Sequence, residues 1–142
     1  MDLSQYAGYL IRRAAQAHVA AWVREVSAET TSVQFGVLAS LSDNEGKSQR
    51  ELGDALDLDR STIADLVARL ERRGLVARRR DERDLRANVV TLTARGEEEH
   101  RLLAPRVARM NDLLTSRLSE EEREELARLL AEVLAASDGR GG

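Results

Sequence analysis

The sequence predicts a mostly α-helical protein that carries one small β-hairpin. Aromatic residues make up only 3% of the 142 residues, and apolar residues recur at helical spacing through most of the chain. Within residues 48–93, two short amphipathic segments meet at a tight turn, and an arginine-rich loop between two apolar runs follows them. This order is typical of a winged helix-turn-helix, in which one helix enters the major groove of DNA and the hairpin reaches the neighbouring minor groove. We therefore expect the protein to bind double-stranded DNA.

The bulk composition narrows the class of protein. A hydrophobic content of 42% suits a single domain with a real core, or two small lobes that share one. The absence of cysteine excludes disulfides and zinc–thiolate sites. No secretion signal is visible in the first ten residues, and no apolar stretch is long enough to cross a bilayer. We expect a cytoplasmic, nucleoid-associated protein that uses no cofactor, no metal and no membrane.

Positive charge is concentrated in the predicted DNA-binding segment. Residues 60–86 contain nine arginines and five acidic residues, a local charge of +4, although the whole chain carries −3. The remaining 13 basic and 20 acidic residues give the rest of the chain −7. Such a distribution favours one docking orientation on a polyanion.

Two helices are expected before the DNA-binding segment. The first covers residues 3–26, which contain no glycine or proline after Gly8, and the second begins at Thr31-Ser32 and ends near Gly46. We assign residues 1–46 to dimerisation and effector binding.

Capping residues mark the two helices of the DNA-binding lobe, residues 47–93. Ser48 with Glu51 three residues later forms a capping box that opens the first of them. Asp59 is a good N-cap for the second, which ends near Arg73 with Gly74 as its stop. Residues 75–76 and 89–92 read as the two strands of the hairpin.

The C-terminal part is expected to be helical as well. Thr93 begins a helix that runs to about Arg117, with a kink or brief break at Pro105. Ser119 and Glu122 form a second capping box that opens the last helix. We assign residues 94–136 to dimerisation and residues 137–142 to a disordered tail. Leucines near both ends offer more apolar surface than a small lobe buries, so a homodimer is expected, although packing within one monomer is the alternative.

Several segments together resemble the MarR family of transcriptional regulators. They are TSVQFGVL, LDRSTIADLVARLERRGLV, and a D-x-R motif followed by VVTLT, in that order, and the resemblance covers residues 3–136. It implies a triangular homodimer of winged helix-turn-helix lobes that represses an operon from a palindromic operator and leaves DNA when a small ligand binds. Within the family, the first helix and ARMNDLL at 108–114 are similar to the PcaV-type branch, which responds to aromatic carboxylic acids such as protocatechuate. That similarity implies a role in the catabolism of aromatic compounds.

The outward face of the second lobe helix holds the candidate major-groove contacts. The polar residues of this helix face away from its apolar side. Among them we expect DNA contacts from Arg60, Ser61, Thr62 and Arg69. A solvated charged face with capping hydroxyls is the alternative. In the wing, Arg86 is expected to enter the minor groove while Asp84 fixes its guanidinium, and Arg83 shares this role.

The first helix carries an arginine and a histidine beside an apolar stripe, which suits a small aromatic acid. Arg12 would pair with the carboxylate, His18 would hydrogen-bond the carboxylate or a ring hydroxyl, and Trp22 would form the apolar wall. The other candidate effector residues, chosen by position or by the resemblance, are Ile11, Ala39, Met110 and Asn111. The alternative is structural: Trp22 in the core, His18 buried with a hydrogen-bond partner, and Arg12 paired with an acid such as Glu99.

Other classes of protein fit the residues less well. The two histidines are predicted on separate helices, and no phosphate-binding glycine loop or metal-spaced cluster is present, which argues against an enzyme. Two alternatives remain: a DNA-binding regulator or architectural protein without a small-molecule effector, and a protein-interaction module on a winged-helix scaffold.

Overall fold

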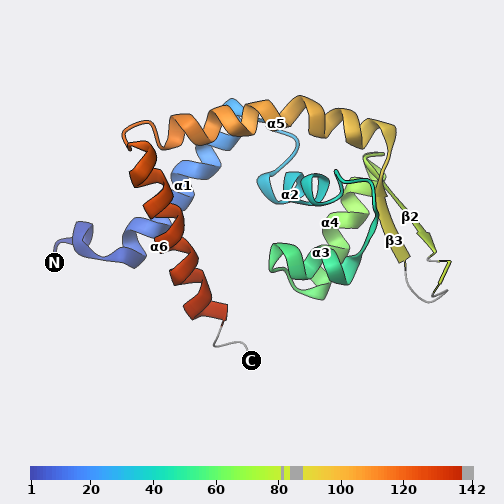
Figure 1. Cartoon of the computed structure of the whole chain (residues 1–142), viewed down its shortest axis with the longest axis horizontal. Helices are drawn as coiled ribbons and strands as arrows, with labels where there is room; N and C mark the ends of the chain where they lie inside the picture. The colour runs from blue at the N-terminus through green and yellow to red at the C-terminus, as the bar shows by residue number, and fades with distance from the viewer. Residues whose placement is uncertain (81, 84–87, 139–142) are drawn as a thin grey trace. The chain divides into compact units, whose positions relative to one another are not determined.

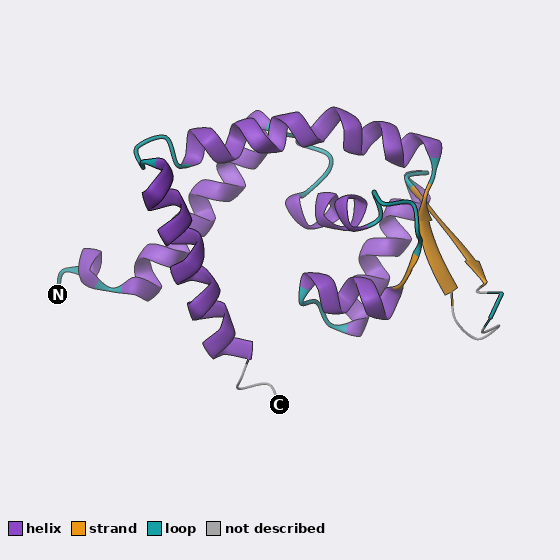
Figure 2. Cartoon of the chain, viewed as in Figure 1, coloured by secondary structure: helices purple, strands orange, loops and turns teal. Residues whose placement is uncertain are grey.

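The computed structural model describes residues 1–80, 82–83 and 88–138. It divides into two compact units, Met1–Met110 and Asn111–Gly142. Helices account for most of the described chain, and a small antiparallel sheet of three strands lies in the first unit (Figures 1 and 2). The predicted fold class, mostly α with a small β wing, is confirmed. None of the helices in the described ranges is long and apolar enough to span a membrane.

The first helix is shorter than predicted. A 3-10 turn, η1 (Leu3–Gln5), precedes α1 (Ala7–Glu25), and the two are separated by Tyr6 in an extended conformation. The carboxylate of Asp2 accepts hydrogen bonds from the backbone N–H and the hydroxyl of Ser4, which closes the turn as a separate element. The prediction of one continuous helix from residue 3 was therefore wrong at its first turn.

Helix α2 (Ser32–Ser40) begins where it was predicted and ends earlier. Thr31 and Gln34 form a capping box at its start. After α2 the chain turns through Asn44 and Gly46, both with positive φ, so the helix cannot reach Gly46. The single lysine, Lys47, donates a hydrogen bond to the carbonyl oxygen of Ser40 at 2.6 Å and ties down this turn.

The two helices of the lobe begin at the predicted caps. Ser48 and Glu51 form the capping box of α3 (Gln49–Leu56), and Asp59 caps α4 (Arg60–Arg72). Gly74 follows α4 with a φ of +75°, as expected for a glycine that stops a helix. The connection between the helices is short because Asp57 adopts the left-handed conformation.

The sheet has one more strand than predicted. The hairpin strands are β2 (Val76–Arg80) and β3 (Asn88–Leu92), paired from Val76 opposite Leu92 to Arg80 opposite Asn88. A two-residue strand, β1 (Lys47–Ser48), pairs with the other edge of β3, giving the order β1-β3-β2. The base of the wing is therefore joined to the start of α3.

Helix α5 (Ala94–Leu114) continues through Pro105, so the predicted brief break is absent. Pro105 is exposed, and solvent can satisfy the carbonyl group that loses its helical partner. The second unit contains the end of α5 and α6 (Glu120–Asp138), which opens with the predicted capping box of Ser119 and Glu122. Residues 139–142 of the predicted tail lie outside the described residues.

The first unit has two separate apolar cores. One lies within the lobe, where α2, α3 and α4 pack against the base of the sheet around Leu38, Leu52 and Val67. The other joins α1 to α5 around Trp22, Leu103 and Met110, with Phe35 of α2 packed against it. The polypeptide between α1 and α2 connects the two cores.

Candidate DNA interface and effector site

The recognition helix α4 has two opposite faces. Ile63, Val67 and Leu70 are almost completely buried in the lobe core. The predicted DNA-contacting residues Ser61, Thr62 and Arg69 lie exposed on the other side, and Arg60, the first residue of α4, is exposed at the N-terminal end of the helix. Because the core holds one face in place, the other can present side chains to a DNA groove with little loss of order.

The N-terminal end of α4 already has an anionic partner. The carboxylate of Asp59 accepts hydrogen bonds from the backbone N–H of Thr62 at 2.7 Å and from the hydroxyl of Ser61 at 3.0 Å. The backbone hydrogen bond from Thr62 is the main reason that the pKa of Asp59 lies below its usual value. Asp59 is the cap that the sequence predicts. We infer that attraction of phosphate to this end depends on arginine side chains more than on the helix terminus.

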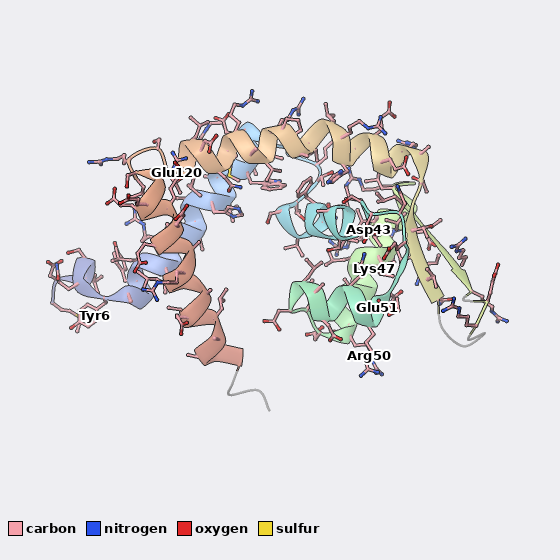
Figure 3. The ribbon with its side chains drawn as sticks, in the orientation of Figure 1. Tyr6, Asp43, Lys47, Arg50, Glu51 and Glu120 are labelled. Atoms are coloured by element: carbon pink, nitrogen blue, oxygen red, sulfur yellow. The ribbon has the colours of Figure 1, made fainter. Side chains whose placement is uncertain are left out.

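A groove between α3 and α4 is lined by further polar residues that were not predicted from the sequence. Gln49 and Arg50 of α3 line it together with Asp59, the N-cap of α4, and Arg60. Figure 3 shows Arg50 pointing away from α3. The capping box at Ser48 had already placed these two residues in the first turn of α3, and this was the signal available in the sequence.

The arginines of strand β2 do not have equal roles. Arg78 donates hydrogen bonds to the carboxylate of Glu71 on α4, at 3.0 and 3.4 Å, and to the side-chain oxygen of Gln49 on α3 at 3.2 Å. The bond from Arg78 lowers the pKa of Glu71. Arg79 and Arg80 are exposed and line a hollow with Arg83. Arg78 therefore links the wing to both lobe helices, whereas its neighbours face solvent.

The tip of the wing can be described only in part. Arg83 is exposed and lines the same hollow as Arg79 and Arg80. Asp84 and Arg86 lie outside the described residues, so their roles stay predictions.

The candidate effector residues on α1 differ in their burial. Trp22 is 5% exposed, and its indole N–H donates to the carbonyl oxygen of Thr30 at 2.7 Å. His18 is half-buried, with its ring 6.1 Å from that of Trp22. Ile11 is 41% exposed, and the guanidinium of the exposed Arg12 lies 5.3 Å from the centre of the Tyr9 ring.

The candidate effector residues on other elements differ in burial and in position. Met110 of α5 is 1% exposed in the same core cluster as Trp22. Ala39 of α2 is half-buried. Asn111 is exposed and belongs to the second unit. The structure thus brings Trp22, His18 and Met110 into the second core and its edge.

A cavity of about 210 Å³ lies beside Trp22, on the side of the link between α1 and α2. Trp22 is the only candidate effector residue among those that line it, the others being Val19, Val23, Ser27, Ala28, Thr30, Thr31 and Ser32. The lining is uncharged. Glu99, considered as a partner for Arg12, instead accepts a hydrogen bond from the hydroxyl of Thr30 at 2.9 Å.

No cluster of three or more metal-ligating side chains occurs within the described ranges.

These features define a class of protein. A helix with one buried and one exposed basic face, followed by an arginine-rich antiparallel hairpin, constitutes a winged helix-turn-helix that binds DNA.

Comparison with known proteins identifies the family. Residues 29–87 match the model of the MarR family. The transcriptional regulator HosA of Escherichia coli O157:H7 is 33% identical over 134 residues, which cover 94% of this chain and 98% of HosA. The chain belongs to the MarR family of transcriptional regulators.

Solved structures of related regulators have the same fold. The PcaV transcriptional regulator of Streptomyces coelicolor, in complex with its natural ligand, superimposes with a TM-score of 0.92 and is 42% identical, covering 96% of this chain and 97% of PcaV. BpsR of Bordetella bronchiseptica, whose DNA binding is regulated by 6-hydroxynicotinic acid, has a TM-score of 0.87 and 30% identity, covering 94% of this chain and 96% of BpsR. Regulators that respond to ligands are therefore among the relatives of this chain.

Proposed function

We propose that this protein is a homodimeric repressor that binds a palindromic operator and leaves it when a small aromatic carboxylic acid binds. The genes under its control would serve the catabolism of aromatic compounds. The observation that carries the proposal is the division of α4 into a buried face around Val67 and an exposed face that presents Ser61, Thr62 and Arg69, with Arg60 exposed at the N-terminal end of the helix. Strand β2, with three consecutive arginines, follows α4 directly.

Apolar surface on both units supports the dimer. In the first unit, α1 leaves Leu10 49% and Val19 62% exposed. In the second unit, none of the side chains described for α6 is buried, although five of them are large and apolar: Leu126, Leu129, Leu130, Val133 and Leu134. A second copy of the chain would cover such surfaces and would repeat the recognition helix by two-fold symmetry.

The similarity to PcaV and BpsR supports the class of ligand, because 6-hydroxynicotinic acid is itself an aromatic carboxylic acid. We assign Arg12 to the carboxylate, His18 to the carboxylate or a ring hydroxyl, and Trp22 to the apolar wall. The remaining assignments are Ile11, Ala39 and Met110 to the lining and Asn111 to a polar ring substituent.

Release from DNA would follow from the spacing of the two recognition helices. They must enter major grooves about 34 Å apart, so a displacement of a few ångströms disrupts one half-site. A ligand produces this effect only by binding the DNA-incompetent arrangement more tightly, with a coupling of about 1–3 kcal/mol.

The test uses an operator duplex selected by the wild-type protein and two ligands that differ in one group. Fluorescence anisotropy gives the operator Kd without ligand, with protocatechuate and with catechol, which lacks the carboxylate. We expect protocatechuate to raise the Kd about 5- to 150-fold and catechol to have little effect. If protocatechuate and other hydroxybenzoates change neither the operator Kd nor the fluorescence of Trp22, the effector part of the proposal is wrong.

The DNA-binding part has a separate test. Phosphate contacts by arginines release counterions, so the operator Kd should rise steeply between low and high salt. A Kd that is insensitive to salt would contradict the proposed interface.

One observation favours the alternative of a DNA-binding regulator without a small-molecule effector. The cavity beside Trp22 has no charged lining residue, and Arg12 lies against Tyr9. The titration with protocatechuate and catechol decides between the two functions. A regulator without an effector site should keep the same operator Kd with either compound, whereas a carboxylate site should respond to protocatechuate alone.

A further inference from the structure

The joint between the recognition helix and the wing is anchored to the link between α1 and α2. Arg73 is the C-cap of α4, and only Gly74 and Leu75 separate it from β2. Its guanidinium donates hydrogen bonds to the hydroxyl oxygen of Thr30 at 2.9 Å and to the side-chain oxygen of Gln34 at 3.3 Å.

Thr30 makes hydrogen bonds to three different parts of the first unit. It is completely buried, and Gln34 is 7% exposed. The hydroxyl of Thr30 donates to the carboxylate of Glu99 on α5 at 2.9 Å while it accepts from Arg73. The carbonyl oxygen of Thr30 accepts from the indole N–H of Trp22 on α1 at 2.7 Å. One residue therefore joins α1, the C-cap of α4 and α5 through three hydrogen bonds.

Thr30 cannot move by itself without breaking at least one of these hydrogen bonds. A buried polar group that loses its partner is costly, and a network whose members are all satisfied holds one arrangement. A displacement of Trp22 that moves the backbone of Thr30 also moves the oxygen that holds Arg73. Arg73 lies at the joint between α4 and β2, so a displacement of Arg73 would act on both elements.

We infer that Thr30 is a positioning residue that couples Trp22 on α1 to the joint between the recognition helix and the wing. The coupling sets operator affinity in the absence of ligand. It also gives a ligand that contacts Trp22 a route to the DNA-binding surface, and this second part rests on the proposed function.

The test is a double-mutant cycle that needs no ligand. Thr30→Val keeps the shape and the backbone carbonyl, and so the bond from Trp22, but removes the hydroxyl. Trp22→Phe keeps an aromatic ring but removes the indole N–H. The operator Kd is measured for wild type, both single variants and the double variant. Thr30→Ser is the matched control because it retains the hydroxyl.

We expect Thr30→Val and Trp22→Phe each to raise the operator Kd, by roughly 2- to 30-fold, and Thr30→Ser to stay close to wild type. In the Thr30→Val background, Trp22→Phe should add little, because its route to Arg73 is already cut. Effects that multiply independently in the double variant would overturn the inference, even if each single variant binds more weakly. A Thr30 that only stabilises the fold would lower the denaturation midpoint and leave the two effects independent.

Two further measurements keep the test decisive. If Thr30→Val does not fold, as judged by circular dichroism, Arg73→Gln takes its place in the cycle and the same non-additivity is expected. Protocatechuate is then titrated into wild type and Thr30→Val. If protocatechuate does not release wild type from the operator but the cycle is non-additive, the proposed effector is rejected and the coupling is retained. Release from both proteins by the same factor, together with an additive cycle, rejects the coupling but retains the effector.

Discussion

Helices α4 and α1 are both amphipathic, but the chain completes the apolar face of only one of them. On α4, Ile63, Val67 and Leu70 are at most 2% exposed. On α1, Trp22 is buried near the C-terminal end, whereas Ile11 and Val19 remain 41% and 62% exposed. The function of α4 can therefore be inferred from that helix alone. Its buried face packs in the core, so the opposite face is the one available to DNA. The function of α1 depends on what else covers it.

The largest expected effect on stability comes from disturbing the contact between the DNA-binding lobe and the start of α5. A Cβ atom on Gly96, in the first turn of α5, would overlap the backbone carbonyl oxygen of Leu75, which cannot move without displacing the start of the wing. We expect Gly96→Ala to lower the free energy of unfolding by about 3 kcal/mol, measured by urea denaturation. Gly8→Ala on α1 is the matched control, since a Cβ there meets nothing within 4 Å. Equal midpoints for the two variants would contradict this packing.

The next effect tests the exposed N-terminal end of α4 as a DNA contact. Arg60→Ala should weaken operator binding about 10- to 100-fold and leave the denaturation midpoint unchanged, because Arg60 is exposed. Arg24→Ala on α1 removes the same charge from outside the lobe and should leave operator affinity nearly unchanged. Similar losses for both variants would mean that total charge, and not this end of α4, determines binding.

A third comparison separates two neighbouring arginines on α1. Arg12→Ala should leave operator affinity intact and raise the protocatechuate concentration needed for release about 10-fold, because a charged hydrogen-bond partner of the ligand is lost. Arg13 donates to the hydroxyl of Tyr9 at 2.9 Å, and Arg13→Ala should not alter release. Anisotropy titrations check both. If both variants need the same protocatechuate concentration for release, Arg12 does not belong to the effector site.

The smallest effect concerns the link between the wing and α4. Because Arg78 lowers the pKa of Glu71, this pair stabilises the folded protein fully above pH 4.5, the ordinary value for Glu71. The contribution disappears as the pH falls through the lowered pKa. Relative to wild type, Glu71→Gln should melt slightly earlier at pH 6 and at the same temperature in strong acid.

Operator affinity distinguishes this pair from an ordinary surface pair. Glu71→Gln should weaken operator binding by at most about five-fold, since the pair is partly exposed. Glu125→Gln breaks the pair with Arg128 within α6 and should show the same trend in melting without a change in affinity. A melting difference for Glu71→Gln that persists in strong acid would contradict the assignment.

The lobe could be predicted closely because its signals are local. Ser48, Asp59 and Gly74 mark helix ends through their own backbone and side-chain chemistry, and the spacing from Ile63 to Leu70 gives the buried face. Strand β1 was missed because two residues carry no periodicity. The break at Tyr6 was missed because it depends on a turn closed by Asp2.

The polar contacts could not be predicted because they join residues that lie far apart in the sequence. Nothing around Thr30 in the chain points to Glu99 or Arg73, and the bond from Arg78 to Gln49 depends on the register of the sheet. For the effector site, the sequence gives side chains of suitable chemistry on α1. Their assembly around a ligand stays a prediction, since only Trp22 among them lines the neighbouring cavity.

The ammonium group of Lys47 donates to the carbonyl oxygen of Ser40 and to the carboxylate of Asp43 (Figure 3). Since Lys47 is the chain's one lysine, acetylation cannot neutralise the arginine-rich DNA surface. The same feature serves the experimenter. An amine-reactive dye at mildly alkaline pH should attach mainly to the N-terminal α-amino group and leave every arginine of the recognition helix and wing chemically intact.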